Sequence, residues 1–106
     1  MILCTNFLHH LHHPQALWET VGQYSRKGTI IFVTDLRRPA TRLKAKKLTA
    51  QYSGGEPAVL RRDYFNSLLA AFTPQEVKAQ LRQAGIVQLK VEVITDRHLV
   101  VFGRIP

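Results

Sequence analysis

Two short apolar runs separated by one helix-length segment constrain the fold of this chain more than any other feature. They cover residues 1–6 (MILCTN) and 29–34 (TIIFVT), and no charged residue interrupts either run. Uninterrupted apolar runs of this length predict strands that are buried on both faces, as in parallel sheets. The segment between them opens at Pro14 and closes at Lys27-Gly28, with helical spacing of Ala16, Leu17, Val21 and Tyr24. Strand, helix and strand at these lengths predict a βαβ unit with parallel strands and a right-handed crossover.

Three further helices are expected in the middle of the chain. Residues 35–39 (DLRRP) are interpreted as a loop, residues 41–52 as a basic helix that ends at Ser53-Gly54-Gly55, and residues 62–72 as the next helix. The third helix has a clear start signal, because Thr73 can be its N-cap, Pro74 its first residue and Glu76 the partner in a capping box. The apolar face of that helix and the glycine that ends it are Val77, Leu81, Ala84 and Gly85.

The last twenty residues predict a hairpin that turns at Thr95-Asp96-Arg97. Residues 87–93 alternate apolar and polar, which indicates one solvated face or an edge position. Residues 98–102 (HLVVF) form a continuous apolar run, which indicates an interior position. We therefore expect a single α/β domain over residues 1–106, in which the final strand is inserted inside the sheet and the penultimate strand lies at an edge.

Four segments, in this order, resemble the second half of class I S-adenosylmethionine-dependent methyltransferases. They are residues 4–14 (CTNFLHHLHHP), 31–39 (IFVTDLRRP), 72–77 (FTPQEV) and 81–86 (LRQAGI). They are similar to the end of that family's fourth strand, to its fifth strand and following loop, and to the helix before its sixth strand. In that family the seventh strand lies between the fifth and the sixth, as expected for this chain. The resemblance covers essentially the whole chain, and it implies a partial Rossmann-like methyltransferase sheet that corresponds to the C-terminal half of the domain.

Two cofactor motifs of that family cannot be placed in these residues. The glycine-rich loop after its first strand and the acidic residue that ends its second strand are both missing, and Gly54-Gly55 follow a helix instead of a strand. The chain also begins inside a strand, so we expect a truncated gene product, a fragment or one piece of a split enzyme. S-adenosylmethionine is the cofactor that the resemblance implies for the intact family, with an unknown, small-molecule methyl acceptor. We do not expect this chain alone to bind the cofactor or to catalyse methyl transfer.

Candidate site residues lie where the first two predicted strands end, because open α/β sheets bind ligands beyond the carboxyl ends of their parallel strands. The resemblance implies cofactor contacts for Asn6, Phe7 and His9, and substrate contacts for His10, Arg37 and Arg38. The alternative is that Asn6 caps a turn and that the histidines decorate a loop.

Asp35 also follows a predicted strand, and no catalytic residue can be assigned there. It could act as a base, but a turn-forming role or an ion pair with Arg37 or Arg38 is the favoured interpretation. Residues 9–13 (HHLHH) suggest zinc, yet adjacent histidines in one short turn cannot all converge on one ion, so no metal site is expected.

Charge is the unusual quantity in the composition. The chain has 15 Lys and Arg residues against 7 Asp and Glu residues, for a net charge of +8. Such a balance favours polyanions. The basic residues cluster at Arg37, Arg38, Arg42, Lys44, Lys46 and Lys47, where Arg38, Arg42 and Lys46 would share one helical face. A solvated helix surface is the favoured interpretation, and a non-catalytic basic module that binds nucleic acid or a protein partner is the alternative function.

Partners and location follow from what the sequence contains. Residues 1–6 carry no charge or proline, so we expect this strand to form a homo-oligomer contact or to pair with an N-terminal half supplied in trans. No run approaches the length of a membrane span, no signal peptide is evident, and the single Cys4 is interpreted as a buried, inert thiol. A cytoplasmic location is the expectation.

Overall fold

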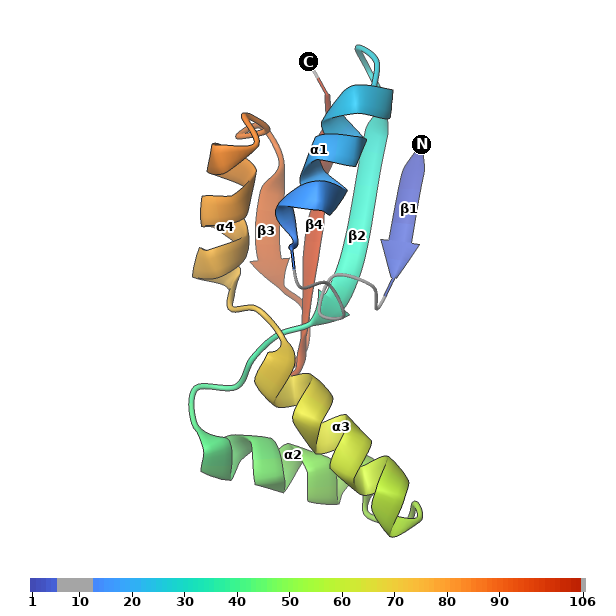
Figure 1. Ribbon diagram of the computed structural model, residues 1–106, viewed down its shortest axis with the longest axis vertical. Coiled ribbons are helices and arrows are strands. Elements are labelled where there is room, and N and C mark those ends of the chain that lie inside the picture. Colours follow the sequence, from blue (N-terminus) through green and yellow to red (C-terminus); the bar gives the residue numbers. More distant parts are fainter. Residues whose placement is uncertain (6–12, 106) are drawn as a thin grey trace.

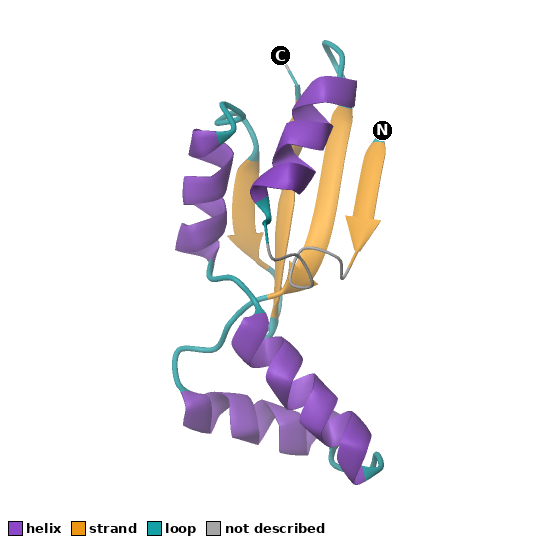
Figure 2. Cartoon of the chain, in the orientation of Figure 1, coloured by secondary structure: helices purple, strands orange, loops and turns teal. Residues whose placement is uncertain are grey.

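A mixed four-stranded sheet organises the chain in the computed structural model, which describes residues 1–5 and 13–105 (Figures 1 and 2). The strands lie in the order β1-β2-β4-β3. The elements are β1 (Ile2–Thr5), α1 (Gln15–Tyr24), β2 (Ile30–Leu36), α2 (Arg42–Ser53), α3 (Ala58–Ala70), α4 (Pro74–Gln83), β3 (Lys90–Val93) and β4 (His98–Arg104).

The pairing of the strands confirms the sheet order expected from the sequence. β1 pairs in parallel with β2, with Ile2 opposite Ile31. β4 is antiparallel to both of its neighbours and pairs with β2 from Ile30↔Arg104 to Leu36↔His98. It also pairs with β3, from Lys90↔Phe102 to Val93↔Leu99. The final strand, β4, is therefore interior, and the penultimate strand, β3, is at an edge. Of these two strands, only β4 is apolar at successive positions, as expected for an interior strand.

Both α1 and α4 cover the same face of the sheet (Figure 1). Trp18 and Val21 of α1 meet Val77 and Leu81 of α4 above the inward-facing residues of the strands, and all four side chains are buried. Within this core the Trp18 indole Nε1–H donates a hydrogen bond of 2.9 Å to Gln80 Oε1. The sheet residues of this core are Ile31, Val33, Leu89, Val91, Leu99 and Val101.

The opposite face of the sheet is open, and here the prediction that the first two strands are buried on both faces is wrong. Burial alternates along β1 and β2, with Leu3 64% exposed, Ile30 39% and Phe32 41%. No helix among the described residues packs over these three side chains, so they contact solvent. Apolar sequence predicted burial, but burial also requires an element that covers the second face.

The hairpin of α2 and α3 extends the molecule beyond the carboxyl ends of β1 and β2 (Figure 1). The described residues span 45 × 23 × 22 Å as a result. A second, smaller core joins the two helices to the end of β2 through Leu36, Ala45, Leu48, Leu68 and Ala71. This hairpin holds most of the basic cluster at one end of the sheet.

Some boundaries differ from those expected, for identifiable reasons. Residues 35 and 36 continue β2 instead of beginning a loop, because β4 is long enough to pair with them. α1 ends at Tyr24, where Ser25 is extended, and not at Lys27-Gly28. α3 begins at Ala58, directly after Pro57, and not at residue 62. Its first turn has no buried apolar face that the sequence could indicate, because Val59 and Leu60 are exposed.

The predicted start of α4 is confirmed in detail. Thr73 Oγ1 accepts a hydrogen bond of 3.2 Å from the Glu76 amide, and Glu76 Oε1 accepts one of 2.8 Å from the Thr73 amide. The helix is followed by Gly85 at φ 75°, a left-handed conformation that favours glycine. Local chemistry alone determines both ends, so the sequence was sufficient to place this helix.

The Trp18–Gln80 hydrogen bond predicts a measurable coupling between α1 and α4. We expect Gln80→Leu to lower the free energy of unfolding by about 1–3 kcal/mol, because it leaves a buried indole N–H without an acceptor. The double variant Trp18→Phe/Gln80→Leu removes both partners and should lose less than the sum of the two single variants. Urea denaturation of the four proteins gives the coupling energy, and strict additivity would show that the bond contributes nothing.

Candidate functional site

Within the part of the chain that the structure describes, polar side chains from several elements meet at the end of the sheet that faces the α2–α3 hairpin. This end, formed by the ends of the strands, is called the predicted edge below. β1 and β2 run in the same direction, so their carboxyl ends share this edge. β4 runs the opposite way, so its first residue, His98, lies beside Leu36 at the same edge. The turn at residues 95–97 is therefore brought to the place where such sheets bind ligands.

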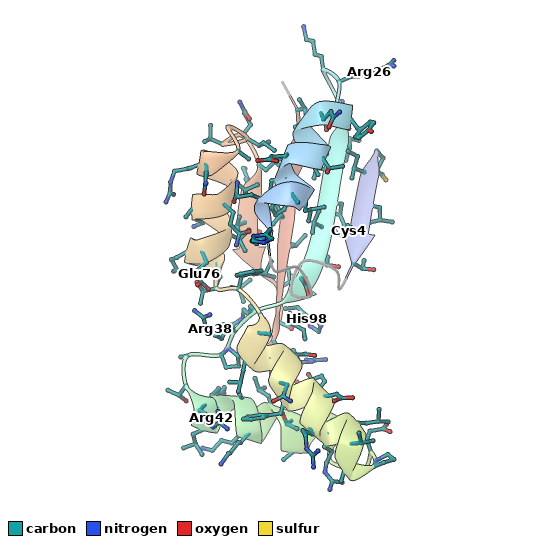
Figure 3. All side chains as sticks on the ribbon, in the orientation of Figure 1. Cys4, Arg26, Arg38, Arg42, Glu76 and His98 are labelled. Carbon is teal, nitrogen blue, oxygen red and sulfur yellow. The ribbon has the colours of Figure 1, made fainter. Side chains whose placement is uncertain are left out.

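Four of the six residues that the sequence suggested for the site are Asn6, Phe7, His9 and His10, and these lie outside the described residues. The other two are described, and Figure 3 places Arg38 at the junction between the sheet and the hairpin. The structure brings both arginines to the predicted edge, but each of them has a contact within the chain.

Arg37 is held against the β3–β4 turn. Its amide donates a hydrogen bond of 2.9 Å to the Arg97 carbonyl, and its Nε–H donates one of 3.3 Å to the Thr95 carbonyl. Among the residues that the structure describes it forms no ion pair. Its guanidinium is half-buried and retains further donors, so it can still receive an anionic group.

Arg38 is paired with α4. Its guanidinium lies 2.9 Å from Glu76 Oε1, and its amide donates a hydrogen bond of 3.2 Å to the Phe72 carbonyl. Partial burial acts to raise the pKa of Glu76, but the Thr73 amide and the Arg38 charge outweigh it and hold that pKa below its usual range. Glu76 thus has two roles, since it closes the capping box and neutralises Arg38. Arg38 was also expected to share a helical face with Arg42, but it lies outside α2.

Asp35 lies within β2, and the expectation that it forms a turn is wrong. Its side chain is 1% exposed, and Oδ1 accepts a hydrogen bond of 2.7 Å from the Leu36 amide. Asp35 also affects Cys4 on the neighbouring strand, β1. Burial is the larger cause that raises the pKa of the half-buried Cys4 thiol, and Asp35 raises it further, so the unreactive protonated form is favoured.

Three residues fasten α2 to the β3–β4 turn. The Tyr52 hydroxyl donates a hydrogen bond of 3.0 Å to Asp96 Oδ2, and an Arg97 guanidinium N–H donates one of 3.0 Å to Asp96 Oδ1. The same guanidinium carbon lies 3.5 Å from the centre of the Tyr52 ring, in a cation–π contact. Desolvation acts to raise the pKa of Asp96, but the two hydrogen bonds lower it overall, so the carboxylate remains charged.

His98 lies at this end of the sheet, and its imidazole is neutral at pH 7 because its pKa is lowered from its usual value. Its Nδ1 lies 2.9 Å from Thr95 Oγ1, which leaves Nε2 for another partner. Burial and the positive charge of Arg97 lower the pKa of His98, although the carboxylates of Asp96 and Asp35 oppose them. A neutral imidazole at pH 7 can accept a proton from a ligand.

Tyr64, on α3, is a further titratable group that Arg97 affects. Burial raises the pKa of Tyr64, and Arg97 opposes that rise.

The sequence alone indicated residues 95–97 only as a turn and His98 only as the start of a strand, and so Asp96, Arg97, His98 and their partner Tyr52 were not among the predicted site residues. A signal was present. An interior antiparallel strand must start at the edge where its parallel neighbour ends, so a polar run just before such a strand faces the site. Tyr52 could not have been found in this way, because its contact depends on how the α2–α3 hairpin folds back.

Metal ligation and membrane insertion receive no support from the residues described. No group of three His, Cys, Asp or Glu side chains in residues 1–5 and 13–105 is arranged to hold a metal ion. In the same residues, no helix is both long and apolar enough to span a bilayer.

A groove of about 460 Å³ lies between α4 and β3, away from this edge, and its lining includes Lys78, Arg82, Lys90 and Glu92.

Comparisons with known proteins give no assignment. The chain matches no protein-family model, no curated protein and no solved structure.

The lowered pKa of His98 predicts a pH dependence of stability. A histidine whose pKa is lower in the folded than in the unfolded state binds fewer protons when folded, so stability falls as the pH drops below about 6.5. We expect the urea midpoint of the protein to fall between pH 8 and pH 5.5, and His98→Gln to lose most of that decrease. His13→Gln is the control, since His13 is exposed. An identical pH profile for the wild type and His98→Gln would contradict this assignment.

Proposed function

We propose that this chain forms the C-terminal, acceptor-side half of a class I S-adenosylmethionine-dependent methyltransferase fold. On this proposal it contributes residues that hold an unidentified small-molecule methyl acceptor, and it does not catalyse methyl transfer by itself. The cofactor and the first half of the sheet belong to a complementary segment, which is either joined to this chain or supplied in trans.

The sheet order is the observation that carries the proposal. A parallel pair followed by an antiparallel hairpin, with the last strand inserted between the two others, is the arrangement that the sequence resemblance implies. The two crossover helices, α1 and α4, lie on the same face, and the long connection between β2 and α4 contains the α2–α3 hairpin. β4 pairs with β2 although β3 lies between them in the chain. This order is informative, because adjacent strands are usually consecutive in the chain.

The exposed apolar face of the sheet supports the proposal that a complementary segment covers it. Leu3, Ile30 and Phe32 are exposed on it, and a shallow hollow of about 300 Å³ is lined there by Ile30, Ile31, Phe32, Phe102, Gly103 and Arg104. Fully burying one such side chain stabilises a protein by about 1.5–3 kcal/mol. Helices that cover this face would gain that stabilisation several times over. The proposed complementary segment supplies such helices.

The site residues fit an acceptor-side role. His98 is the group suited to receive a proton from an attacking acceptor, and Arg37 is suited to orient an anionic part of it. Methyl transfer is a direct displacement whose rate depends on how closely donor and acceptor are aligned. Without the glycine-rich loop and the ribose-binding acid, these residues alone lack the means to align the donor.

The first test of the proposal is cofactor binding. Calorimetric titration of this chain with S-adenosylmethionine should show no binding in the micromolar range, because the cofactor motifs are absent from its sequence. The same titration is then made with the chain joined to, or co-expressed with, the polypeptide encoded immediately upstream. We expect micromolar binding only there. Binding by these 106 residues alone would contradict the division of the cofactor site, and no binding by either preparation would contradict the methyltransferase assignment.

The second test concerns the β1 edge. The far edge of the sheet, β3, carries the charged Lys90 and Glu92, whereas Ile2–Thr5 of β1 carry no charge or proline. Unprotected edges pair with other strands. We expect this chain, studied alone, to form a dimer or higher oligomer by light scattering, with β1 at the contact.

Two variants locate that contact. Leu3→Lys, which places a charge on β1, should shift the protein toward monomer with its circular dichroism unchanged. The matched control, Val93→Lys, is on β3 and should leave the assembly intact. A monodisperse wild-type monomer at high concentration would show that β1 needs no partner.

A further inference from the structure

The positive charge of this chain is concentrated in one segment. Six of the fifteen Lys and Arg residues lie between positions 37 and 47, and no Asp or Glu lies between positions 36 and 55. Four of the six, namely Arg42, Lys44, Lys46 and Lys47, belong to α2 and are exposed.

These charges are placed where they destabilise the helix that carries them. Arg42 and Lys44 lie in the first turn of α2, where the helix dipole favours negative charge, and that turn contains no acidic residue. No basic residue lies in its last turn, where positive charge would be favourable. Arg42 and Lys46 are also four residues apart, and Lys44 and Lys47 three apart, so like charges face each other.

The described residues give these four charges little compensation. Lys44, Lys46 and Lys47 form no ion pair with any described residue, although Lys44 makes a minor contribution to the lowered pKa of Asp96. Arg42 differs, because its guanidinium lies 5.0 Å from the centre of the Phe65 ring. The packing face of α2, which includes Ala45, Leu48 and Thr49, is buried, and the lysines are exposed. The α2–α3 hairpin itself projects from the sheet (Figure 1). Violations of local helix rules that nothing in the fold offsets are expected at functional sites.

We propose that the basic surface of α2, formed by Lys44, Lys46 and Lys47, docks the phosphate backbone of a nucleic acid. The three lysines lie within four consecutive positions, about one turn of the helix, so they can contact neighbouring phosphates of a strand. The aromatic residue of α2, Tyr52, is 42% exposed, but Arg97 lies over one face of its ring and Asp96 accepts a hydrogen bond from its hydroxyl, so it is already engaged within the chain. Recognition is therefore through phosphates and independent of base sequence.

An anionic membrane fits this surface less well. Helices that lie in a bilayer interface need a broad apolar face to insert into the lipid. The apolar face of α2 is already packed against α3, and Leu43 is the large apolar residue left among the lysines. The proposed docking does not depend on cofactor binding or methyl transfer, so it stands or fails separately from the proposed function.

The test compares two triple variants that lose the same charge. Lys44→Gln/Lys46→Gln/Lys47→Gln removes the proposed surface and leaves Arg42 on Phe65. Lys78→Gln/Arg82→Gln/Lys90→Gln is the control, with three exposed residues that line the groove between α4 and β3. Fluorescence anisotropy measures binding of a labelled 20-nucleotide RNA and of a 20-base-pair DNA duplex at 50 and 200 mM NaCl.

We expect the α2 variant to bind the duplex at 50 mM salt about tenfold or more weakly than the wild type, and its salt slope to be smaller by about 2–3. The control variant should stay close to the wild type. The thermal midpoint of the α2 variant should be unchanged or higher, because like-charge repulsion is removed, and this excludes unfolding as the cause. Equal losses in the two variants would overturn the proposal in favour of net charge, as would no measurable binding by the wild type. Wild-type binding to vesicles with 30% phosphatidylserine, without nucleic-acid binding, would assign the surface to membranes instead.

Discussion

The pairing of β4 with both β2 and β3 is the interaction on which the other features of this structure depend. β4 contributes Leu99 and Val101 to the core beneath α1 and α4, and its hydrogen bonds extend β2 through Asp35 and Leu36. The antiparallel direction of β4 also brings His98 and the preceding turn to the edge where the parallel strands end. Because β4 lies beside β2, the turn that precedes β4 reaches Arg37, which donates hydrogen bonds to the Thr95 and Arg97 carbonyls.

The two faces of the sheet differ in how completely helices cover them. One face is covered by two helices, and the buried Trp18 indole N–H is satisfied there by Gln80 Oε1. The other face leaves large apolar side chains in water, where they contribute little to folding. The net stability of a small domain is the difference between large opposing terms, so this missing burial matters. The same absence makes the open face and the β1 edge available to a partner.

The sequence predicted those parts of the fold that depend on local chemistry or on simple periodicity. The α4 capping box, the glycine after it and the interior position of 98–102 are of this kind. It failed where a long-range contact decides the outcome. An apolar run such as TIIFVT cannot indicate whether both faces will be covered, and DLRRP cannot indicate that a partner strand will extend β2 by two residues. Arg37 and Arg38 lie at the end of the sheet where the sequence placed its candidate site, while Tyr52 and Asp96 are 44 residues apart and meet only after the hairpin docks.

Charge placement separates the two surfaces at this end of the molecule. At the junction, two of the positive charges have an acidic partner and a structural role: Arg38 is paired with Glu76, and Arg97 is paired with Asp96 and lies over the Tyr52 ring. On α2, only a few residues away, the lysines have no such partner among the described residues, and Lys44 in the first turn acts against the helix dipole. Selection for solubility alone would be satisfied by mixed charges, with acidic residues in the first turn of α2. Uniform positive charge on a helix that it destabilises is therefore better explained by an anionic partner, and the fastening of α2 to the β3–β4 turn would hold such a partner beside the edge that contains Arg37 and His98.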